Sequence, residues 1–181
     1  MARIAAAAMI EASLDTMNDL RRVALPEDIA GALYLAAMPG RYRHIDRDLA
    51  EAVAYEISIV VCLTPLKEIE AKSVRYAEAL EAGSMPFDVR NHPIQDFGHP
   101  TDAEAFVTFV ADVTAALRDG ERVMIHCAGG IGRTGLVASC VLRALGVEYE
   151  AAVATVRAAG SHTENTQQKA FVREFSPVQA I

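Results

Sequence analysis

Segments that predict β-strands alternate along this chain with segments in which apolar residues recur at helical spacing. Strands are predicted at 32–37, 57–63, 85–92 and 123–126. The unbroken apolar run at 57–63 is typical of a central parallel strand. Helices are predicted at 45–53, 64–80 and 101–120, from about 133 onward, and at 148–159 and 166–175. A capping box, Thr-Asp-Ala-Glu at 101–104, is expected to open the third of these helices.

This alternation predicts a three-layer α/β/α fold around a central, mainly parallel sheet of about four to five strands. In such folds the ligand crevice lies at the carboxyl ends of the strands. A chain of 181 residues is long enough for one well-buried core and short for two, so residues 31–181 are predicted to form a single domain. Residues 1–30 contain an apolar stripe of helical spacing that Pro26 ends, and no chemistry is assigned to them.

The junction between the last predicted strand and the following helix carries the most informative residues. Residues 123–135 read Val-Met-Ile-His-Cys-Ala-Gly-Gly-Ile-Gly-Arg-Thr-Gly. A strand, a glycine-rich loop and a helix N-terminus direct successive backbone N–H groups into one concavity, which favours a bound anion. Phosphate is the expected anion, and the loop residues expected to hold it are Ala128, Gly129, Gly130, Ile131 and Gly132.

Two side chains of this junction are candidates for chemistry. Cys127 precedes the loop, where N–H dipoles, the helix end and Arg133 would favour a thiolate, so Cys127 is the candidate nucleophile. Arg133 can fold back over the loop and hold two phosphate oxygens with its planar fork. The alternative for Cys127 is a small buried apolar residue at a strand end.

The pattern His-Cys, five residues, Arg-Thr resembles the signature of the cysteine-based protein tyrosine and dual-specificity phosphatases. His126, Cys127, Arg133 and Thr134 all fit this signature. The resemblance implies an enzyme that hydrolyses phosphomonoesters through a cysteinyl-phosphate intermediate, with no metal and no other cofactor. It also implies that the Thr134 hydroxyl assists the departure of the thiolate.

A proton donor for the leaving group must complete such a site, because an alkoxide or phenoxide leaves phosphorus slowly without one. Asp96 is the candidate, since it lies in a loop of turn residues that follows a predicted strand. His92 and His99 compete for the same role. An aspartate that only caps a turn is the plain alternative.

Residues 92–102, His-Pro-Ile-Gln-Asp-Phe-Gly-His-Pro-Thr-Asp, resemble the general-acid loop of the kinase-associated phosphatase (cyclin-dependent kinase inhibitor 3) group. Segments 33–40, 61–64 and 126–136 are also similar to that group, and the resemblance spans roughly 30–175. It implies that Asp96 is the general acid, Cys127 the nucleophile and Arg133 the phosphate clamp. It also suggests that Gln168 positions the hydrolytic water, with an exposed polar residue on a helix as the alternative. Residues 1–30 match nothing in that group, so a kinase partner is left open.

The cysteines bear on redox chemistry and on location. Cys62 ends an adjacent predicted strand and is a candidate redox partner that would form a disulfide with oxidised Cys127; a packed strand residue is the alternative. Cys62, Cys127 and Cys140 form no paired framework and no metal-binding spacing, and a catalytic thiolate needs a reducing compartment. With no convincing leader and no apolar span of ~20 residues, a cytoplasmic location is expected.

The net charge of the chain and the charges near the loop limit which partners and substrates it can bind. The formal net charge of −7 argues against nucleic acid or an anionic membrane as the main partner. The loop 128–132 contains no Lys or Arg, which favours a phosphoprotein substrate over an inositol phosphate or phosphoinositide and leaves Tyr against Ser/Thr open. The basic turn 41–44 is expected to be solvated or to meet an acidic phosphosubstrate. Glu68 and Lys72, at i, i+4 spacing, are expected on a solvated face.

Two rival functions use similar features. A non-catalytic phosphate-binding module that docks on a kinase is the first, but such relatives typically lack the Cys, the Arg or the acid. A rhodanese-like sulfurtransferase also places a Cys between a strand and a helix. The spacing from Cys127 to Arg133 and the loop around Asp96 argue against it.

Overall fold

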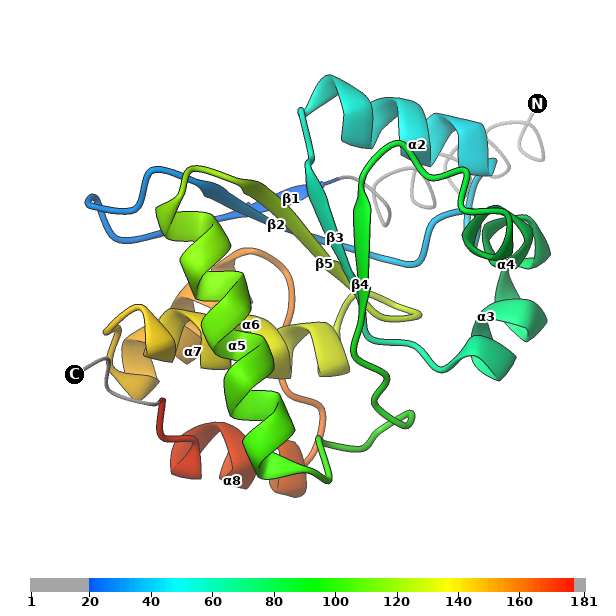
Figure 1. Cartoon of the computed structure of the whole chain (residues 1–181). Helices are drawn as coiled ribbons and strands as arrows, with labels where there is room; N and C mark the ends of the chain where they lie inside the picture. The colour runs from blue at the N-terminus through cyan, green and yellow to red at the C-terminus, as the bar shows by residue number, and fades with distance from the viewer. Residues whose placement is uncertain (1–19, 178–181) are drawn as a thin grey trace, which may run out of the picture.

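The computed structural model describes residues 20–177, which fold around one five-stranded sheet (Figure 1). The strand order is β1-β2-β5-β3-β4. The strands are β1 Arg21–Val23, β2 Ala32–Ala36, β3 Ile59–Cys62, β4 Asp88–Asn91 and β5 Arg122–His126. Strands β2 to β5 are parallel, and β1 pairs antiparallel with β2 at one edge. The predicted α/β class with a mainly parallel sheet is confirmed.

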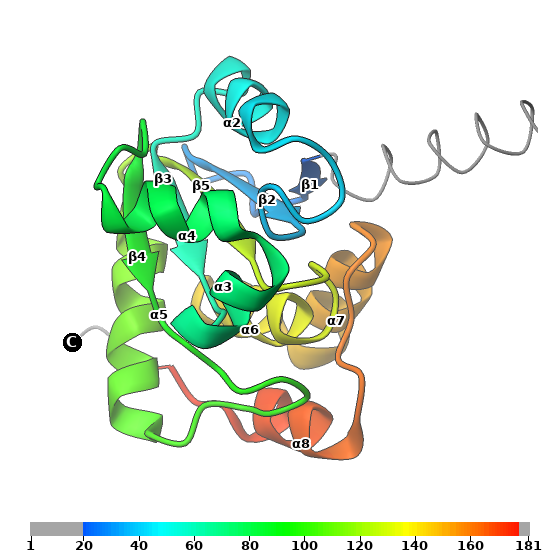
Figure 2. The same ribbon diagram turned by 90° about the vertical axis from the view of Figure 1, so that its right-hand side faces the viewer.

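Helices cover both faces of the sheet and make the outer two layers (Figures 1 and 2). One face is covered by α5 Ala103–Arg118, α6 Gly132–Ala144, α7 Tyr149–Ala158 and α8 Thr166–Glu174. The other face is covered by α2 Ile45–Ala54, α3 Leu66–Lys72 and α4 Val74–Glu81. Within residues 20–177 no helix has the length and apolar character needed to cross a membrane.

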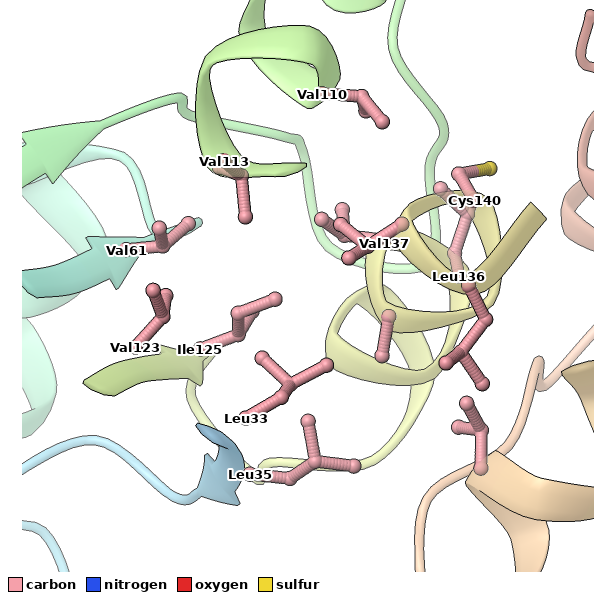
Figure 3. Packing of buried hydrophobic residues seen from close by; sticks show 14 of the residues in the cluster. Leu33, Leu35, Val61, Val110, Val113, Val123, Ile125, Leu136, Val137 and Cys140 are labelled. Atoms are coloured by element: carbon pink, nitrogen blue, oxygen red, sulfur yellow. The ribbon is translucent and has the colours of Figure 1, made fainter. Parts of the chain in front are cut away.

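The strands supply both cores through their alternating side chains. Leu33 and Leu35 of β2 join the main core under α5 and α6, whereas Tyr34 turns to the smaller cluster beneath α2. Figure 3 shows Val113 of α5 pointing toward Ile125 of β5 in this main core. Each large apolar side chain buried here contributes about 1.5–3 kcal/mol. The core therefore fixes α6, whose first turn follows the glycine-rich loop.

The single helix predicted at 64–80 is wrong, because the structure has two helices that meet at Ser73. Ser73 has φ −156° and ψ 80°, outside the helical region. Its hydroxyl donates a hydrogen bond to the Pro39 carbonyl at 2.8 Å, so the break is fixed by a residue distant in sequence. Helical periodicity contains no information about such a contact.

Strand β1 lies inside the segment 1–30, where the sequence showed an apolar stripe of helical spacing ended by Pro26; from Leu20 to Pro26 the structure has no helix, and residues 21–23 form a strand instead. It is three residues long and only Val23 is fully buried, so it carries no visible apolar pattern. Its pairing with β2 extends the sheet into that segment. The predicted stripe positions Ile10, Leu14 and Met17 lie outside the described residues.

Two boundaries also differ from expectation. The strand predicted at 85–92 is shorter, since β4 pairs with β3 only over Asp88–Asn91. Helix α5 is capped by Asp102 rather than by Thr101 of the predicted box. The Asp102 carboxylate accepts a hydrogen bond from the Ala105 N–H at 3.0 Å, as an N-cap residue does.

Candidate active site

The glycine-rich loop joins the end of β5 to the start of α6, as the sequence predicts. Cys127 opens the loop and is 3% exposed. Gly130 has φ +68°, and a Cβ at this position would lie 2.3 Å from the Ala36 carbonyl oxygen of the neighbouring strand. Glycine is therefore required at 130 both by the backbone conformation and by the close approach of β2.

Hydrogen bonds from outside the loop hold the Gly130 carbonyl in place. Arg21 of β1 donates to it through Nη2 at 2.6 Å, and the Ser161 hydroxyl donates at 2.6 Å. Neither Arg21 nor Ser161 lines the cavity in front of the loop. These bonds hold the carbonyl dipole on the far side of the loop from the expected anion.

A cavity of about 160 Å³ lies in front of the loop. Its lining residues are Arg41, Lys72, Asp96, Phe97, Cys127, Ala128, Gly129, Ile131, Gly132, Arg133 and Glu164. Cys127, Arg133 and Asp96, which the sequence places in two separate segments, thus face one small space.

His126 supports the loop from beneath and is fully buried. Its Nδ1 lies 3.2 Å from the Cys127 carbonyl oxygen and its Nε2 lies 2.9 Å from the Tyr76 hydroxyl. A neutral imidazole that donates from Nδ1 and accepts at Nε2 satisfies both contacts. Burial, helped by the nearby positive charge of Arg133, lowers the pKa of His126 to about 4. His126 is therefore neutral near pH 7 and orients the Cys127 backbone.

The Arg133 guanidinium is 2% exposed and is fixed by a second residue, Glu68 of α3. Nη1 and Nη2 of Arg133 donate to the two Glu68 carboxylate oxygens at 2.8 and 2.9 Å, and Nη1 also donates to the Ile94 carbonyl at 3.0 Å. The bond to Arg133 is the largest cause that lowers the pKa of Glu68 to about 2, against the effect of burial. Burial alone would lower the pKa of Arg133, but Glu68 and Cys127 outweigh it and raise that pKa.

Asp96 meets the same guanidinium from the opposite loop. Its Oδ1 lies 3.0 Å from Nη2 of Arg133 and its Oδ2 lies 3.9 Å from Nζ of Lys72. The Asp96 side chain is 50% exposed, in contrast to the buried Arg133. Asp96 therefore lies at the mouth of the cavity, on the side open to solvent.

Helix α8 holds the backbone of the Asp96 loop. Nδ2 of Asn165 donates to the Phe97 carbonyl at 2.7 Å, and Nε2 of Gln168 donates to the Gly98 carbonyl at 2.9 Å. The Gln168 carboxamide oxygen also accepts from the Glu164 N–H at 2.8 Å. Gln168 is fully buried, so the alternative of an exposed helix residue is wrong.

Comparison with known proteins shows the family to which this chain belongs. A family model described as the DSP-PTPase phosphatase domain of Swiss Army Knife proteins (PTP-SAK) matches residues 32–179. The chain belongs to this family. The cyclin-dependent kinase inhibitor 3 of Homo sapiens is 40% identical over 52 residues, which are 29% of this chain and 24% of that protein. The chain thus spans about a quarter of the length of this curated relative.

Solved phosphatase structures share the fold of this DSP-PTPase domain. A crystal structure of kinase-associated phosphatase, with its catalytic cysteine replaced by serine, has a TM-score of 0.76 at 24% identity and covers 86% of this chain and 92% of that one. The active form of Tk-PTP has a TM-score of 0.63 at 26% identity and covers 85% of this chain and 92% of that one.

The other predicted residues of this DSP-PTPase domain take distinct places. Thr134 is buried in the first turn of α6, and its hydroxyl has no hydrogen-bond partner within residues 20–177. His92 stacks on Phe109 with ring centroids 4.3 Å apart, and His99 stacks on Phe171 at 5.3 Å. Neither histidine lines the cavity, so their competition with Asp96 is not supported.

The remaining two cysteines of the DSP-PTPase domain lie in different surroundings. Cys62 ends β3, where its backbone is in register with His126, and burial raises the pKa of its thiol to about 11. Cys140 lies on α6 among apolar side chains of the main core (Figure 3), and burial raises its pKa well above the ordinary value. Cys140 is a structural residue.

The sequence analysis did not place several residues at the DSP-PTPase site where the structure has them. Glu68 and Lys72 were expected on a solvated face, but Glu68 binds Arg133 and Lys72 lines the cavity. Arg41 of the basic turn also lines the cavity. Glu164 reaches Gly132 so closely that a Cβ there would lie 1.7 Å from its Oε2. Only the i, i+4 spacing of Glu68 and Lys72 gave a signal in the sequence.

Proposed function

We propose that this protein is a cysteine-dependent phosphoprotein phosphatase that works through a cysteinyl-phosphate intermediate. The observation that carries the proposal is the convergence of Cys127, Arg133 and Asp96 on one cavity of about 160 Å³. A nucleophile, a bidentate cation and a proton donor are the three groups that this chemistry needs.

In the first step the Cys127 sulfur attacks phosphorus, the bond from phosphorus to the ester oxygen breaks, and that oxygen takes a proton from the Asp96 carboxyl and leaves as the alcohol or phenol. Loop N–H groups and Arg133 stabilise the charge on the other phosphate oxygens. Nη1 and Nη2 of Arg133 each donate one hydrogen bond to Glu68. Asp96 also contacts Nη2. A bound phosphate would take the place of Asp96 on Nη2, which frees the Asp96 carboxyl to face the leaving oxygen.

In the second step a water molecule attacks the phosphorus of the cysteinyl phosphate while Asp96 accepts its proton. The thiolate leaves, and the Thr134 hydroxyl, which lacks a partner among the described residues, donates a hydrogen bond to it. We assign Gln168 to the position of the Asp96 loop rather than to the water, because both ends of its carboxamide are bound to backbone groups.

A phosphoprotein is the substrate class that the cavity favours. Arg41, Lys72 and Arg133 are countered by Asp96 and Glu164, so the lining offers little excess positive charge for a polyphosphorylated inositol ring. Inositol phosphates and phosphoinositides are the alternative substrates. We propose a protein partner at this site and no obligatory cofactor, and we leave a kinase partner open.

The deciding experiment replaces the nucleophile. Cys127→Ser should abolish turnover of p-nitrophenyl phosphate and retain binding of inorganic phosphate, measured by calorimetry, because the loop and Arg133 remain. Cys140→Ser is the matched control, since this buried cysteine lies away from the cavity and its variant should keep its turnover. Turnover by Cys127→Ser would end the proposal.

We further propose that Cys62 protects Cys127 from irreversible oxidation. Hydrogen peroxide would oxidise the Cys127 thiolate to a sulfenic acid and be reduced to water. The Cys62 sulfur would then form the S–S bond, and the sulfenic hydroxyl would leave as water with the Cys62 proton. Peptide mapping after mild peroxide should find the 62–127 link in the wild-type protein; finding none would dispose of this role.

A further inference from the structure

A second, larger hollow lies on the edge of the sheet beside the candidate active site. Its volume is about 740 Å³. It is lined by α3, α4 and the ends of β3 and β4, and Figure 2 shows both helices in front of this side of the sheet. Its apolar floor comes from Leu66, Ile69, Val74, Ala77, Leu80 and Val89. We call this hollow the α3–α4 groove.

Exposed apolar residues and an open strand edge make the α3–α4 groove unusual. Leu66 and Val74 are 54% and 59% exposed. Strand β4 is the last strand of the sheet, paired with β3 on one side only within the described residues. Apolar surface next to an unpaired strand edge is the combination that binds a peptide segment of another protein.

The charges around the groove are of one sign. Its lining holds three carboxylates, Glu70, Glu78 and Glu81, and no Lys or Arg. Glu78 approaches Arg75 at 3.8 Å with both side chains exposed, whereas Glu70 and Glu81 have no ion-pair partner among residues 20–177. A partner segment should therefore carry Lys or Arg beside its apolar residues.

Helix α3 connects the groove to the catalytic residues. Leu66, Ile69 and Glu70 line the groove, while Glu68 and Lys72 of the same helix lie beside Arg133 and Asp96. Cys62, which lines the groove at the end of β3, is in register with His126 beneath the phosphate loop. A segment bound in the groove would thus lie next to the elements that hold the phosphate site.

We propose that the α3–α4 groove docks an apolar segment with flanking Lys or Arg residues of the protein substrate. This inference rests on the proposed function, because it assigns the groove to the same substrate whose phosphorylated residue enters the cavity. The groove supplies affinity for the substrate protein, and the cavity supplies the reaction.

The binding test uses the Cys127→Ser protein and unphosphorylated peptides. An array of peptides with paired apolar residues, flanked either by Arg or by Glu, is expected to bind with a preference of about tenfold or more for Arg. The double variant Glu78→Lys/Glu81→Lys should remove this preference. Glu150→Lys/Glu174→Lys, at exposed positions on α7 and α8, is the control of equal charge change and should retain it. Absence of the Arg preference overturns the proposal.

The kinetic test separates docking from catalysis. A phosphotyrosyl peptide joined to a bound array sequence should have a KM about tenfold lower than the phosphopeptide alone, and Glu78→Lys/Glu81→Lys should erase the difference. Turnover of p-nitrophenyl phosphate should not change in that variant. If p-nitrophenyl phosphate is hydrolysed but no peptide shows the Arg preference, docking fails and the proposed function stands. If peptides bind with that preference but nothing is hydrolysed, the proposed function fails.

Two other occupants give recognisable results that would also overturn the proposal. Dimerisation in sedimentation experiments that Glu78→Lys/Glu81→Lys abolishes would assign the groove to a second copy of the chain. Binding to phosphatidylcholine vesicles that the same variant abolishes would assign it to a lipid surface.

Discussion

The glycine-rich loop 128–132, the proposed phosphate loop, and the Asp96 loop line the same cavity, but the protein holds them in different ways. Buried and half-buried groups surround the phosphate loop: half-buried Arg21 and buried Ser161 bind its Gly130 carbonyl, and buried His126 supports it from beneath. The Asp96 loop is exposed at its tip and is bound to α8 by two side-chain hydrogen bonds, at the carbonyls of residues 97 and 98.

This difference separates two tasks of a phosphoryl-transfer site. The groups that bind phosphate oxygens must be fixed before the substrate arrives, since preorganised donors stabilise the transition state without rearrangement. In the proposed mechanism the proton donor serves leaving groups of different shape, and Asp96 must leave Nη2 of Arg133 when phosphate binds there. Substitutions on the phosphate-loop side should therefore affect every substrate, and those on the Asp96 side should depend on the leaving group.

The largest loss of activity is expected from Arg133→Lys. Lysine cannot keep the two-pronged bond to Glu68 or hold two phosphate oxygens, so kcat/KM should fall by about 10²–10³-fold for all phosphomonoesters. Steady-state assays with p-nitrophenyl phosphate and an alkyl phosphate measure it, with exposed Arg157→Lys as the control. A loss confined to one substrate would contradict the assignment of Arg133 to the phosphate itself.

The second-largest loss of activity is expected from Asp96→Asn, which should lower kcat by about 10²-fold for an alkyl phosphate. The loss should be much smaller for p-nitrophenyl phosphate, whose leaving group needs little protonation. The same pair of substrates measures it, and exposed Asp112→Asn serves as the control. Equal losses for both substrates would move the acid role to another residue.

Gln168→Ala should have a smaller effect of the same kind. Loss of the hydrogen bond to the Gly98 carbonyl costs about 1 kcal/mol, or about fivefold in the step that Asp96 assists. The ratio of alkyl to p-nitrophenyl phosphate rates should fall, as in Asp96→Asn, which a general loss of stability would not produce. Exposed Gln167→Ala is the neighbouring control and should leave the ratio unchanged.

The smallest expected effect is that of pH on the free energy of unfolding near neutrality. His126 is neutral there and Glu68 is ionised, and these are the forms that the fold prefers. Neutral His126 stabilises the fold fully above pH 6.5, and this contribution is lost as the pH falls toward 4. Ionised Glu68 stabilises it fully above pH 4.5, and this is lost as the pH falls toward 2.

Urea unfolding measured against pH should therefore show two separate steps. Glu68→Gln should remove only the lower step, and His126→Asn only the upper one. Exposed His162→Gln should leave both in place. A single step, or an upper step that survives in His126→Asn, would show that other groups control acid stability.

The sequence predicted most of the fold and the placement of Cys127 and Arg133 at one loop, because those features have local signals. The strand, glycine-rich loop and helix at 123–135 are continuous in sequence, and the fixed spacing of Cys127 and Arg133 places both at one loop. The main core also follows from periodicity, as Leu33 and Leu35 alternate with Tyr34 along β2.

The features that the sequence did not reveal depend on contacts between distant residues. Glu68 meets Arg133 across 65 positions, and Gln168 meets Gly98 across 70. An i, i+4 pair such as Glu68 and Lys72 has the same appearance whether it faces solvent or a buried guanidinium. The break at Ser73 has the same origin, since its hydroxyl bonds to residue 39.

Strand β1 matters for the design of truncated forms of this protein. The family match begins at residue 32, but Arg21 lies eleven positions earlier and holds the Gly130 carbonyl. A fragment cut at the family boundary would lose that cation and leave the edge of β2 bare. We expect such a fragment to bind phosphate weakly because strand β1 is missing. That weak binding would then be mistaken for a property of the whole protein.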